Sequence, residues 1–212
     1  NDKSINEISV SNIYNLDNYI FNKRLLDKLK GNWHGYIYKN GKIYAENKLI
    51  ESIAPYSFQK IDKSWQQIFL EGLGFSWKKQ DFALPRIQKK ESIDVGLNWH
   101  VHPEWTSKHW PKENWEELYQ ILKKDYSVSW QKGLNDFDEY INWMSSCKLI
   151  VTCETMGKHL ASALRKKVIA IVGAAESNEF SYNRIISIKP NSRDCMPCNS
   201  PKCKFEKGCL SE

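Results

Sequence analysis

The chain has 212 residues, 41% of them hydrophobic and 26% charged, and its formal net charge is +6. This apolar content supports one large core or two small ones, and the modest positive charge gives only weak support for binding anions. No apolar run approaches the roughly 20 residues of a membrane-spanning helix, so we expect neither a membrane span nor a signal peptide.

The first part of the chain is expected to form short strands and a helix. Residues 13–16 are typical of a strand, and residues 19–29 fit a helix that Gly31 would end. Residues 33–38 predict a second strand. The Asn40-Gly41 pair that follows indicates a hairpin turn, because both residues tolerate positive φ.

A helix and a linker are expected next. Residues 65–73 carry apolar side chains at helical spacing, with Gly74 as the stop. Residues 76–92 are polar and contain a proline, so we expect them to link two lobes. Residues 1–92 therefore make up a first lobe and its linker.

Strands and helices alternate over residues 93–190, which is typical of an open parallel α/β sheet. The expected strands are 93–99, 126–130, 149–153, 168–172 and 185–188. Pro111 suits the first turn of one helix, and Asn135 or Asp136 would cap the next. We expect this second helix to bury one face, made of Phe137, Tyr140, Ile141 and Met144.

The centre of this lobe is the stretch of residues 148–173. A buried strand, a turn, a short helix and a second strand form a βαβ unit there, with parallel strands and a right-handed crossover. Ligands of such sheets bind beyond the carboxyl ends of the strands, and free N–H groups at a helix start suit a phosphate. Many α/β proteins carry this unit without a ligand, so its spacing alone leaves binding open. The residues at the expected site are Glu154, Thr155, Met156, Gly157 and His159.

The cysteines fall into two groups. Cys147 and Cys153 flank a buried strand and predict packing thiols. The other group has the spacing C-x2-C-x4-C-x5-C, which predicts one tetrahedral metal ion in a structural site, with zinc as the default. Two disulfides or free thiols are the alternative. The predicted metal ligands are Cys195, Cys198, Cys203 and Cys209.

Four blocks of sequence follow one another in a particular order after residue 92. They are residues 95–111 with Lys-His-Trp-Pro at their end, residues 137–147, residues 154–164, and the Cys-Met-Pro-Cys of residues 195–198. Together they resemble glycosyltransferase family 9, the ADP-heptose:lipopolysaccharide heptosyltransferases. The third block looks like the family signature Asp-[Ser/Thr]-Gly-x-x-His-[Leu/Ile]-Ala-x-Ala-Leu, and the fourth like its Cys-x-Pro-Cys tail.

This resemblance implies the GT-B arrangement of two Rossmann-like lobes, with the donor bound in the C-terminal lobe. Residues 93–190 would then be the nucleotide-sugar donor lobe, residues 1–92 a partial acceptor-side α/β lobe, and residues 191–212 a metal knuckle with four cysteine ligands. The opening strand of the family, its glycine-rich loop and the aspartate thought to act as base have no counterpart here. We therefore expect the N-terminal part of the family fold to be missing, and Asp17 is not matched to the base.

The resemblance also assigns roles in the site. Lys108 would act in catalysis by stabilising the leaving diphosphate, so no metal is expected at the transfer site; a solvated lysine is the plainer alternative. Thr106 and Ser107 would offer hydroxyls to phosphate. Glu154 stands where the family has an aspartate thought to bind sugar hydroxyls, and Met156 replaces a family glycine that permits close backbone approach.

Three further expectations concern the helix start and the preceding loop. Thr155 would offer its N–H and hydroxyl to the diphosphate, and Gly157 would compensate for the methionine before it. His159 matches the family histidine and would hydrogen-bond phosphate, although a structural histidine fits nearly as well. Stacking by Trp99 and its histidine neighbours is left open.

The leading hypothesis is an inverting glycosyltransferase that moves a heptose or related sugar from an ADP-type nucleotide diphosphate donor to a glycan or protein acceptor. The alternative is a non-catalytic sugar-nucleotide-binding or assembly module. The only feature that favours nucleic-acid binding is the set of lysines in the cysteine-rich tail, so we expect no nucleic-acid partner. We expect a cytoplasmic protein; contact with the inner face of the cell membrane and homo-oligomers stay open. Iron joins zinc as the expected metal, because the related autotransporter heptosyltransferases hold iron in a similar cysteine finger.

Overall fold

The computed structural model describes residues 6–20, 22–53, 63–80, 84, 90–133, 136–173, 183–191, 194–196, 198, 200–205 and 208–211. These residues form two compact units, one up to Lys79 and one from Gln80 onward. The boundary falls inside the stretch of residues 76–92 in which a linker is expected. Within the described ranges, no helix is both long and apolar enough to cross a membrane.

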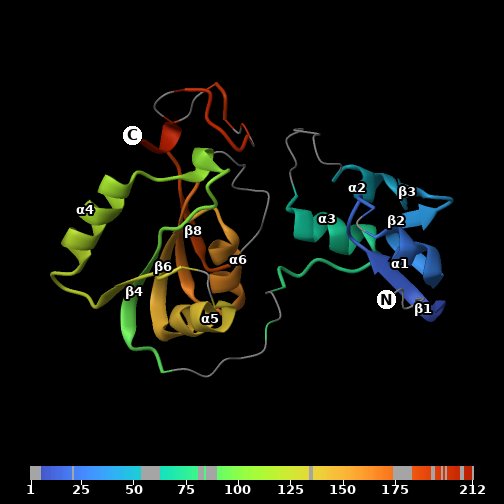
Figure 1. Ribbon diagram of the computed structural model, residues 1–212, viewed down its shortest axis with the longest axis horizontal. Coiled ribbons are helices and arrows are strands. Elements are labelled where there is room, and N and C mark those ends of the chain that lie inside the picture. Colours follow the sequence, from blue (N-terminus) through green and yellow to red (C-terminus); the bar gives the residue numbers. More distant parts are fainter. Residues whose placement is uncertain are drawn as a thin grey trace, which may run out of the picture. The chain divides into compact units, whose positions relative to one another are not determined.

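The N-terminal unit holds a small mixed sheet with the strand order β1-β2-β3. Strand β1 runs parallel to β2, and β2 runs antiparallel to β3 (Figure 1). The elements in chain order are β1 (Ile8–Asn15), α1 (Lys23–Lys28), β2 (Leu29–Lys39), β3 (Lys42–Ala45), α2 (Lys48–Glu51) and α3 (Trp65–Gly72).

Local sequence signals account for two features of this unit. The predicted hairpin between β2 and β3 is confirmed, with φ angles of 52° at Asn40 and 75° at Gly41. Helix α3 begins after Ser64, whose side chain caps it, and ends before Gly74, which has a φ of 82°. Both features depend only on residues close in sequence.

Two expectations for this unit are wrong. The helix expected over residues 19–29 is confined to α1, because Leu29 already begins β2. Gly31 does not end a helix but lies inside β2, where a Cβ atom would sit 2.4 Å from the Val10 carbonyl oxygen of β1. The pairing of β1 with β2 changes register at this point, so the glycine serves a close approach of two strands.

The C-terminal unit is built on five parallel strands in the order β5-β4-β6-β7-β8. The predicted parallel α/β sheet is therefore confirmed. Its elements are β4 (Ile93–Asn98), the 3-10 helix η1 (Thr106–Lys108), α4 (Lys112–Leu122), β5 (Val128–Trp130), α5 (Phe137–Ser146), β6 (Cys147–Cys153), α6 (Met156–Ala163), β7 (Lys167–Ile171), β8 (Ile185–Ile188) and the 3-10 helix η2 (Cys209–Ser211).

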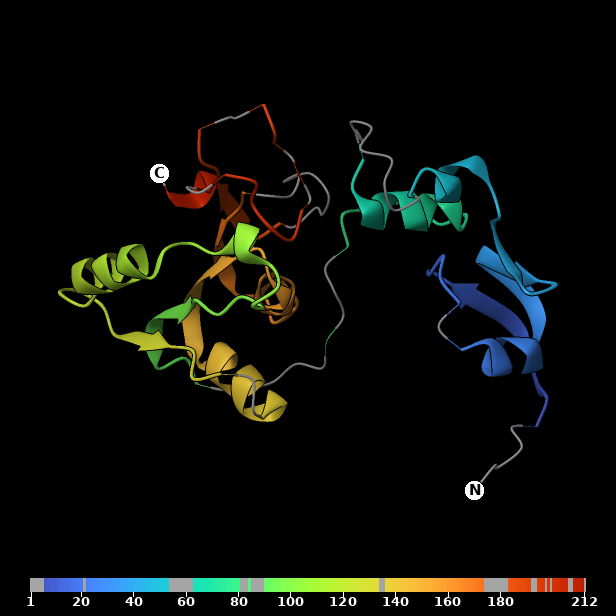
Figure 2. The ribbon, with the colours of Figure 1, turned by 45° about the horizontal axis from the view of Figure 1, so that its top comes forward.

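Helices cover both faces of this sheet (Figure 2). On one face, Trp115 of α4 belongs to the same buried cluster as Val151 of β6. On the other face, Met144 of α5 and Ala161 of α6 share a cluster with Ile150. Because side chains alternate along a strand, the neighbours Ile150 and Val151 serve opposite layers, which explains the continuous apolar run of β6.

Helix α5 begins at the predicted position but buries a narrower face. The Asp136 carboxylate accepts hydrogen bonds from two backbone N–H groups of the first turn, which confirms its role as cap. Tyr140 and Met144 are buried as expected, whereas Phe137 is 49% exposed. The hydroxyl of Tyr140 already reaches Asn98, the last residue of β4, so Phe137, one turn earlier, lies beyond the strand end.

The expected packing thiols are confirmed. Cys147 and Cys153 are free and fully buried at the two ends of β6. Burial disfavours the thiolate and raises the pKa of Cys147 to about 11 and that of Cys153 to about 12. Neither thiol is therefore a nucleophile at neutral pH.

Candidate functional site

The chain changes the direction in which it adds strands beside β4. From β4 it proceeds to β5 on one side and then crosses to β6 on the other. Ligands of open α/β sheets bind at such a switch point, outside the carboxyl ends of the strands. A pocket of about 320 Å³ lies there, lined by Asn98 at the end of β4, Gln131 after β5 and Glu154 after β6.

This pocket gathers most of the predicted binding residues. Lys108 and the consecutive residues Glu154, Thr155, Met156 and Gly157 all line it, although Lys108 comes from a distant loop. Thr106, Ser107 and His159 do not. The remaining lining residues are Asn98, His100, Val101, His102, Trp105, Gln131 and Tyr140.

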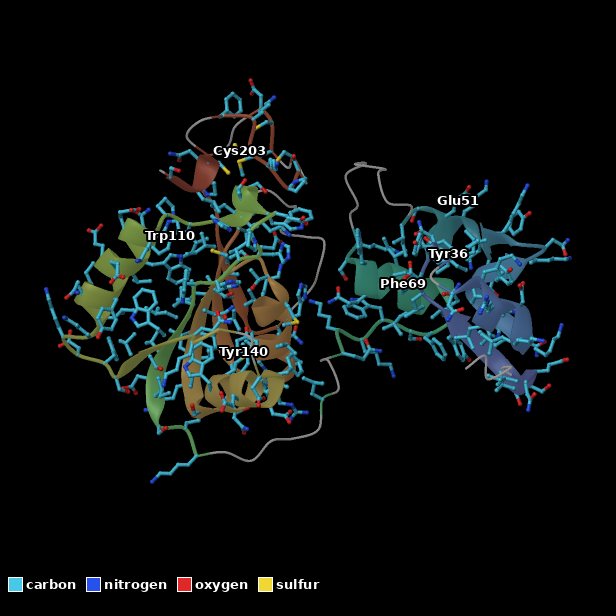
Figure 3. All side chains as sticks on the ribbon, in the orientation of Figure 1. Tyr36, Glu51, Phe69, Trp110, Tyr140 and Cys203 are labelled. Atoms are coloured by element: carbon cyan, nitrogen blue, oxygen red, sulfur yellow. The ribbon has the colours of Figure 1, made fainter. Side chains whose placement is uncertain are left out.

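A buried hydrogen-bond network forms the floor of the pocket. The Asn98 side chain, 1% exposed, donates from Nδ2 to Thr152 Oγ1 over 2.8 Å. Its Oδ1 accepts a 2.9 Å bond from the Tyr140 hydroxyl, which projects from α5 (Figure 3). Burial raises the pKa of Tyr140, so the hydroxyl keeps its proton. The network ties β4, β6 and α5 together at the edge where a ligand would bind.

Three N–H groups at the start of α6 are hydrogen-bonded within the protein. The N–H of Thr155 donates to the Cys153 carbonyl, and the Thr155 hydroxyl and carbonyl accept from the N–H groups of Gly157 and Lys158. The Thr155 N–H is thus engaged within the chain, and the expected contact of its N–H and hydroxyl with a diphosphate stays a prediction.

Glu154 and Lys158 form a buried ion pair one helical turn apart. Glu154 Oε1 lies 2.9 Å from Lys158 Nζ, and the two side chains are only 6% and 7% exposed. The second carboxylate oxygen, Oε2, is buried and has no hydrogen-bond partner. Because Glu154 lines the pocket, this oxygen is an acceptor suited to a hydroxyl of a ligand.

Lys108 is positioned by an aromatic ring of its own loop. Its Nζ lies 4.3 Å from the ring centroid of Trp105, a cation–π contact, and both residues line the pocket. The Lys108 ammonium group and the Glu154 carboxylate therefore line the same cavity.

Ser107 is used by the C-terminal tail. Its hydroxyl donates to the Ser200 carbonyl, and its N–H donates to the Pro201 carbonyl over 3.2 Å. Phosphate binding by this hydroxyl would require it to leave the Ser200 carbonyl, and it stays a prediction. Thr106, which is exposed, and Ser107 line a second cavity of about 710 Å³ that Cys203 of the tail also borders. The tail thus holds the loop that carries Lys108.

His159 is neutral at physiological pH. Burial, together with the positive charges of Lys158 and Lys108, lowers its pKa to about 4. The influence of Lys108 shows that His159 lies within electrostatic reach of the pocket cation. A neutral imidazole there can donate a hydrogen bond to an anionic ligand.

The stability of the C-terminal unit is expected to rise between about pH 4 and about pH 6.5, the usual histidine value. The folded chain holds the pKa of His159 at about 4, so the unfolded chain binds more protons in this window and stability falls as pH falls. The His159 contribution is at most about 3 kcal/mol. Urea unfolding at several pH values should show a shallower dependence for His159→Gln; equal slopes would contradict the assignment.

The tail cysteines differ in burial in this structure. Cys195, Cys198 and Cys203 are partly buried and Cys209 is buried. Cys203 lies in the tail beyond the sheet (Figure 3). Among the described residues, which include all four cysteines, no three His, Cys, Asp or Glu side chains are gathered closely enough to hold a metal ion. The metal knuckle stays a prediction.

Five residues of the pocket were not among the predicted site residues, namely Asn98, Val101, Trp105, Gln131 and Tyr140. Asn98 ends a predicted strand, Gln131 follows another, and Tyr140 lies on an expected buried helix face. The rule that ligands lie beyond strand ends points to the first two. Nothing in the local sequence of Tyr140 distinguishes a hydroxyl that reaches the pocket from an ordinary core tyrosine.

The comparisons with known proteins agree with this architecture. No protein-family model and no curated protein matches the chain. Among solved structures, E. coli heptosyltransferase WaaC with ADP matches with a TM-score of 0.59 and 13% sequence identity, over 86% of this chain and 67% of that one. The fold resembles that of a heptosyltransferase.

The likeness to WaaC concerns the fold alone, because 13% of residues are identical. It agrees with the predicted α/β fold of GT-B type, with a five-stranded parallel sheet and a smaller mixed sheet.

Proposed function

We propose that this chain binds a nucleotide diphosphate sugar of ADP type and transfers a heptose or related sugar, with inversion, to a glycan or protein acceptor. The observation that carries the proposal is the switch-point pocket, where the cationic Lys108 and the unpartnered Glu154 oxygen line one cavity. The likeness of the fold to a heptosyltransferase supports it.

The two groups have complementary tasks in this reaction. The acceptor oxygen bonds to the anomeric carbon while the bond from that carbon to the diphosphate oxygen breaks, so negative charge develops on the diphosphate. Lys108, held against Trp105, stabilises this charge without a metal ion. Glu154 Oε2 accepts from a sugar hydroxyl and orients the donor. We assign no base for the acceptor proton.

Calorimetric titration with ADP and with ADP-heptose tests the donor site. The Lys108→Ala variant should bind ADP at least tenfold more weakly, about 1.4 kcal/mol, because the anion loses its nearest cation. Lys123→Ala is the matched control: Lys123 also lies over an aromatic ring, 5.3 Å from Tyr119, but does not line the pocket. Its affinity should be unchanged.

The outcome separates the enzyme from its alternative. Transfer of sugar from ADP-heptose to a glycan or protein would support the transferase. Binding of ADP without transfer would favour a sugar-nucleotide-binding module. The proposed donor site would be overturned if the folded chain binds neither ligand. It would also be overturned if the Lys108→Ala variant binds both ligands as tightly as the unmodified chain does.

We further propose that the tail cysteines bind one structural zinc or iron ion. The donor set suits such an ion, because four cysteines lie close in sequence and four sulfur ligands leave no open position. Among the described residues these thiols are not gathered closely enough to hold an ion, so metal binding would bring them together. The ion would stabilise the tail that holds Ser107.

Elemental analysis of the purified chain should find about one zinc or iron ion per chain. Cys209→Ser should lose most of it, because the remaining thiols cannot complete a tetrahedral site. Cys147→Ser is the control, since that thiol lies in the core and donates to the Trp143 carbonyl. Equal metal content in both variants, or none in the unmodified chain, would contradict the proposal.

A further inference from the structure

Two buried acceptor oxygens in the same pocket have no partner. Within the described part of the chain, Glu154 Oε2 and Gln131 Oε1 are both buried without a hydrogen bond, and both residues line the switch-point pocket. The Gln131 side chain is 5% exposed. An unsatisfied buried polar group costs about 1–3 kcal/mol, so a pair of them on one cavity points to donors that a ligand supplies.

The backbone of Gln131 is held at the carboxyl end of β5. Its N–H donates to the Leu97 carbonyl over 3.0 Å, and its own carbonyl accepts a 3.2 Å bond from Trp99 Nε1. These bonds attach the Gln131 backbone to β4 and to Trp99, the residue that follows β4. The side chain is therefore presented to the pocket from a rigid strand end, which suits a specificity determinant.

The two oxygens belong to opposite sides of the pocket. Strands β5 and β6 flank β4, and neighbouring strands lie about 4.8 Å apart, so the two strand ends are roughly 10 Å apart. A nucleotide diphosphate sugar has hydroxyl donors at both ends, on its ribose and on its sugar, with the anionic diphosphate between them. Lys108 on the same cavity suits that central charge.

We propose that Gln131 recognises a ribose hydroxyl of the nucleotide, so that the ribose lies over β5 and the transferred sugar over β6 beside Glu154. This inference rests on the proposed function and adds the orientation of the donor and the residue that selects a ribonucleotide. In dinucleotide-binding sheets, a polar side chain likewise hydrogen-bonds the ribose hydroxyl. The neutral amide of Gln131 does so without repelling the diphosphate.

Affinities for ADP, 2′-deoxy-ADP and 3′-deoxy-ADP test this proposal by calorimetry. The unmodified chain should prefer ADP at least tenfold over one of the deoxy analogues, because a buried acceptor left unpaired penalises the ligand that lacks the hydroxyl. Gln131→Ala should bind ADP and that analogue equally. Gln131→Glu keeps an acceptor oxygen and should retain the preference. Gln120→Ala, on the exposed side of α4, is the control.

The ratio of the affinities for ADP and its deoxy analogues separates a loss of ribose recognition from a general loss of stability. If Gln131→Ala weakens all three ligands by one factor, or leaves the preference intact, the proposal is overturned while ADP binding stands. If the unmodified chain binds ADP and both analogues equally, the role of Gln131 is likewise overturned, while ADP binding stands. A folded, unmodified chain that binds no ADP overturns both this proposal and the proposed function.

Discussion

Replacing Lys158 with methionine is expected to lower the free energy of unfolding of the C-terminal unit by about 3–5 kcal/mol. Lys158 Nζ lies 2.9 Å from Glu154 Oε1, and the side chains are 7% and 6% exposed. The substitution leaves a buried carboxylate without its counter-charge, and its other oxygen has no protein partner to compensate. Urea unfolding monitored by tryptophan fluorescence measures the loss.

Two variants give this prediction its controls. Lys148→Met removes a lysine whose 2.7 Å pair with Asp94 is exposed, so it should cost no more than about 1 kcal/mol. The double variant Glu154→Gln/Lys158→Met removes both charges and should recover much of the loss, since contacting residues are not additive. If Lys158→Met and Lys148→Met prove equally mild, the ion pair is not buried as described.

Substituting alanine for Gly157 should destabilise the same unit by about 3 kcal/mol or more and weaken ADP binding. The new Cβ would lie 2.1 Å from Asn98 Nδ2 and 2.6 Å from the Tyr140 hydroxyl oxygen. Overpacking costs about 1–3 kcal/mol, and displacing Asn98 breaks buried hydrogen bonds worth about as much again. Hydrogen exchange at the β4 and β6 amides, read beside urea unfolding, locates the damage in this sheet.

Gly208→Ala is the matched control for this substitution. Its Cβ would meet nothing closer than Cys203 Sγ, at 3.8 Å, so stability should change little. A Gly157→Ala chain as stable as Gly208→Ala would show that α6 does not pack against Asn98. The close approach at this helix start is made by Gly157 to Asn98 and Tyr140 on the floor of the pocket.

Much of the secondary structure follows from short-range sequence patterns. The Asn40-Gly41 turn, the Asp136 cap and the apolar strands around residues 148–173 depend on the residues themselves and their near neighbours. The parallel sheet follows from alternation alone, because a strand, helix and strand of these lengths have few ways to pack. The resemblance of two separate sequence blocks to a known family also pointed to Lys108 and Glu154, which line one pocket.

The sequence by itself thus determined the α/β class, the order of strands and helices in the C-terminal unit and the stretch on which its site is built. Only the tertiary structure decided which groups are available there. Gly31 belongs to a strand because of Val10, and Ser107 is bound by a carbonyl 93 residues away. Asn98 reaches Thr152 across 54 residues of chain. Such contacts depend on how strands and tail pack, which the local sequence does not specify.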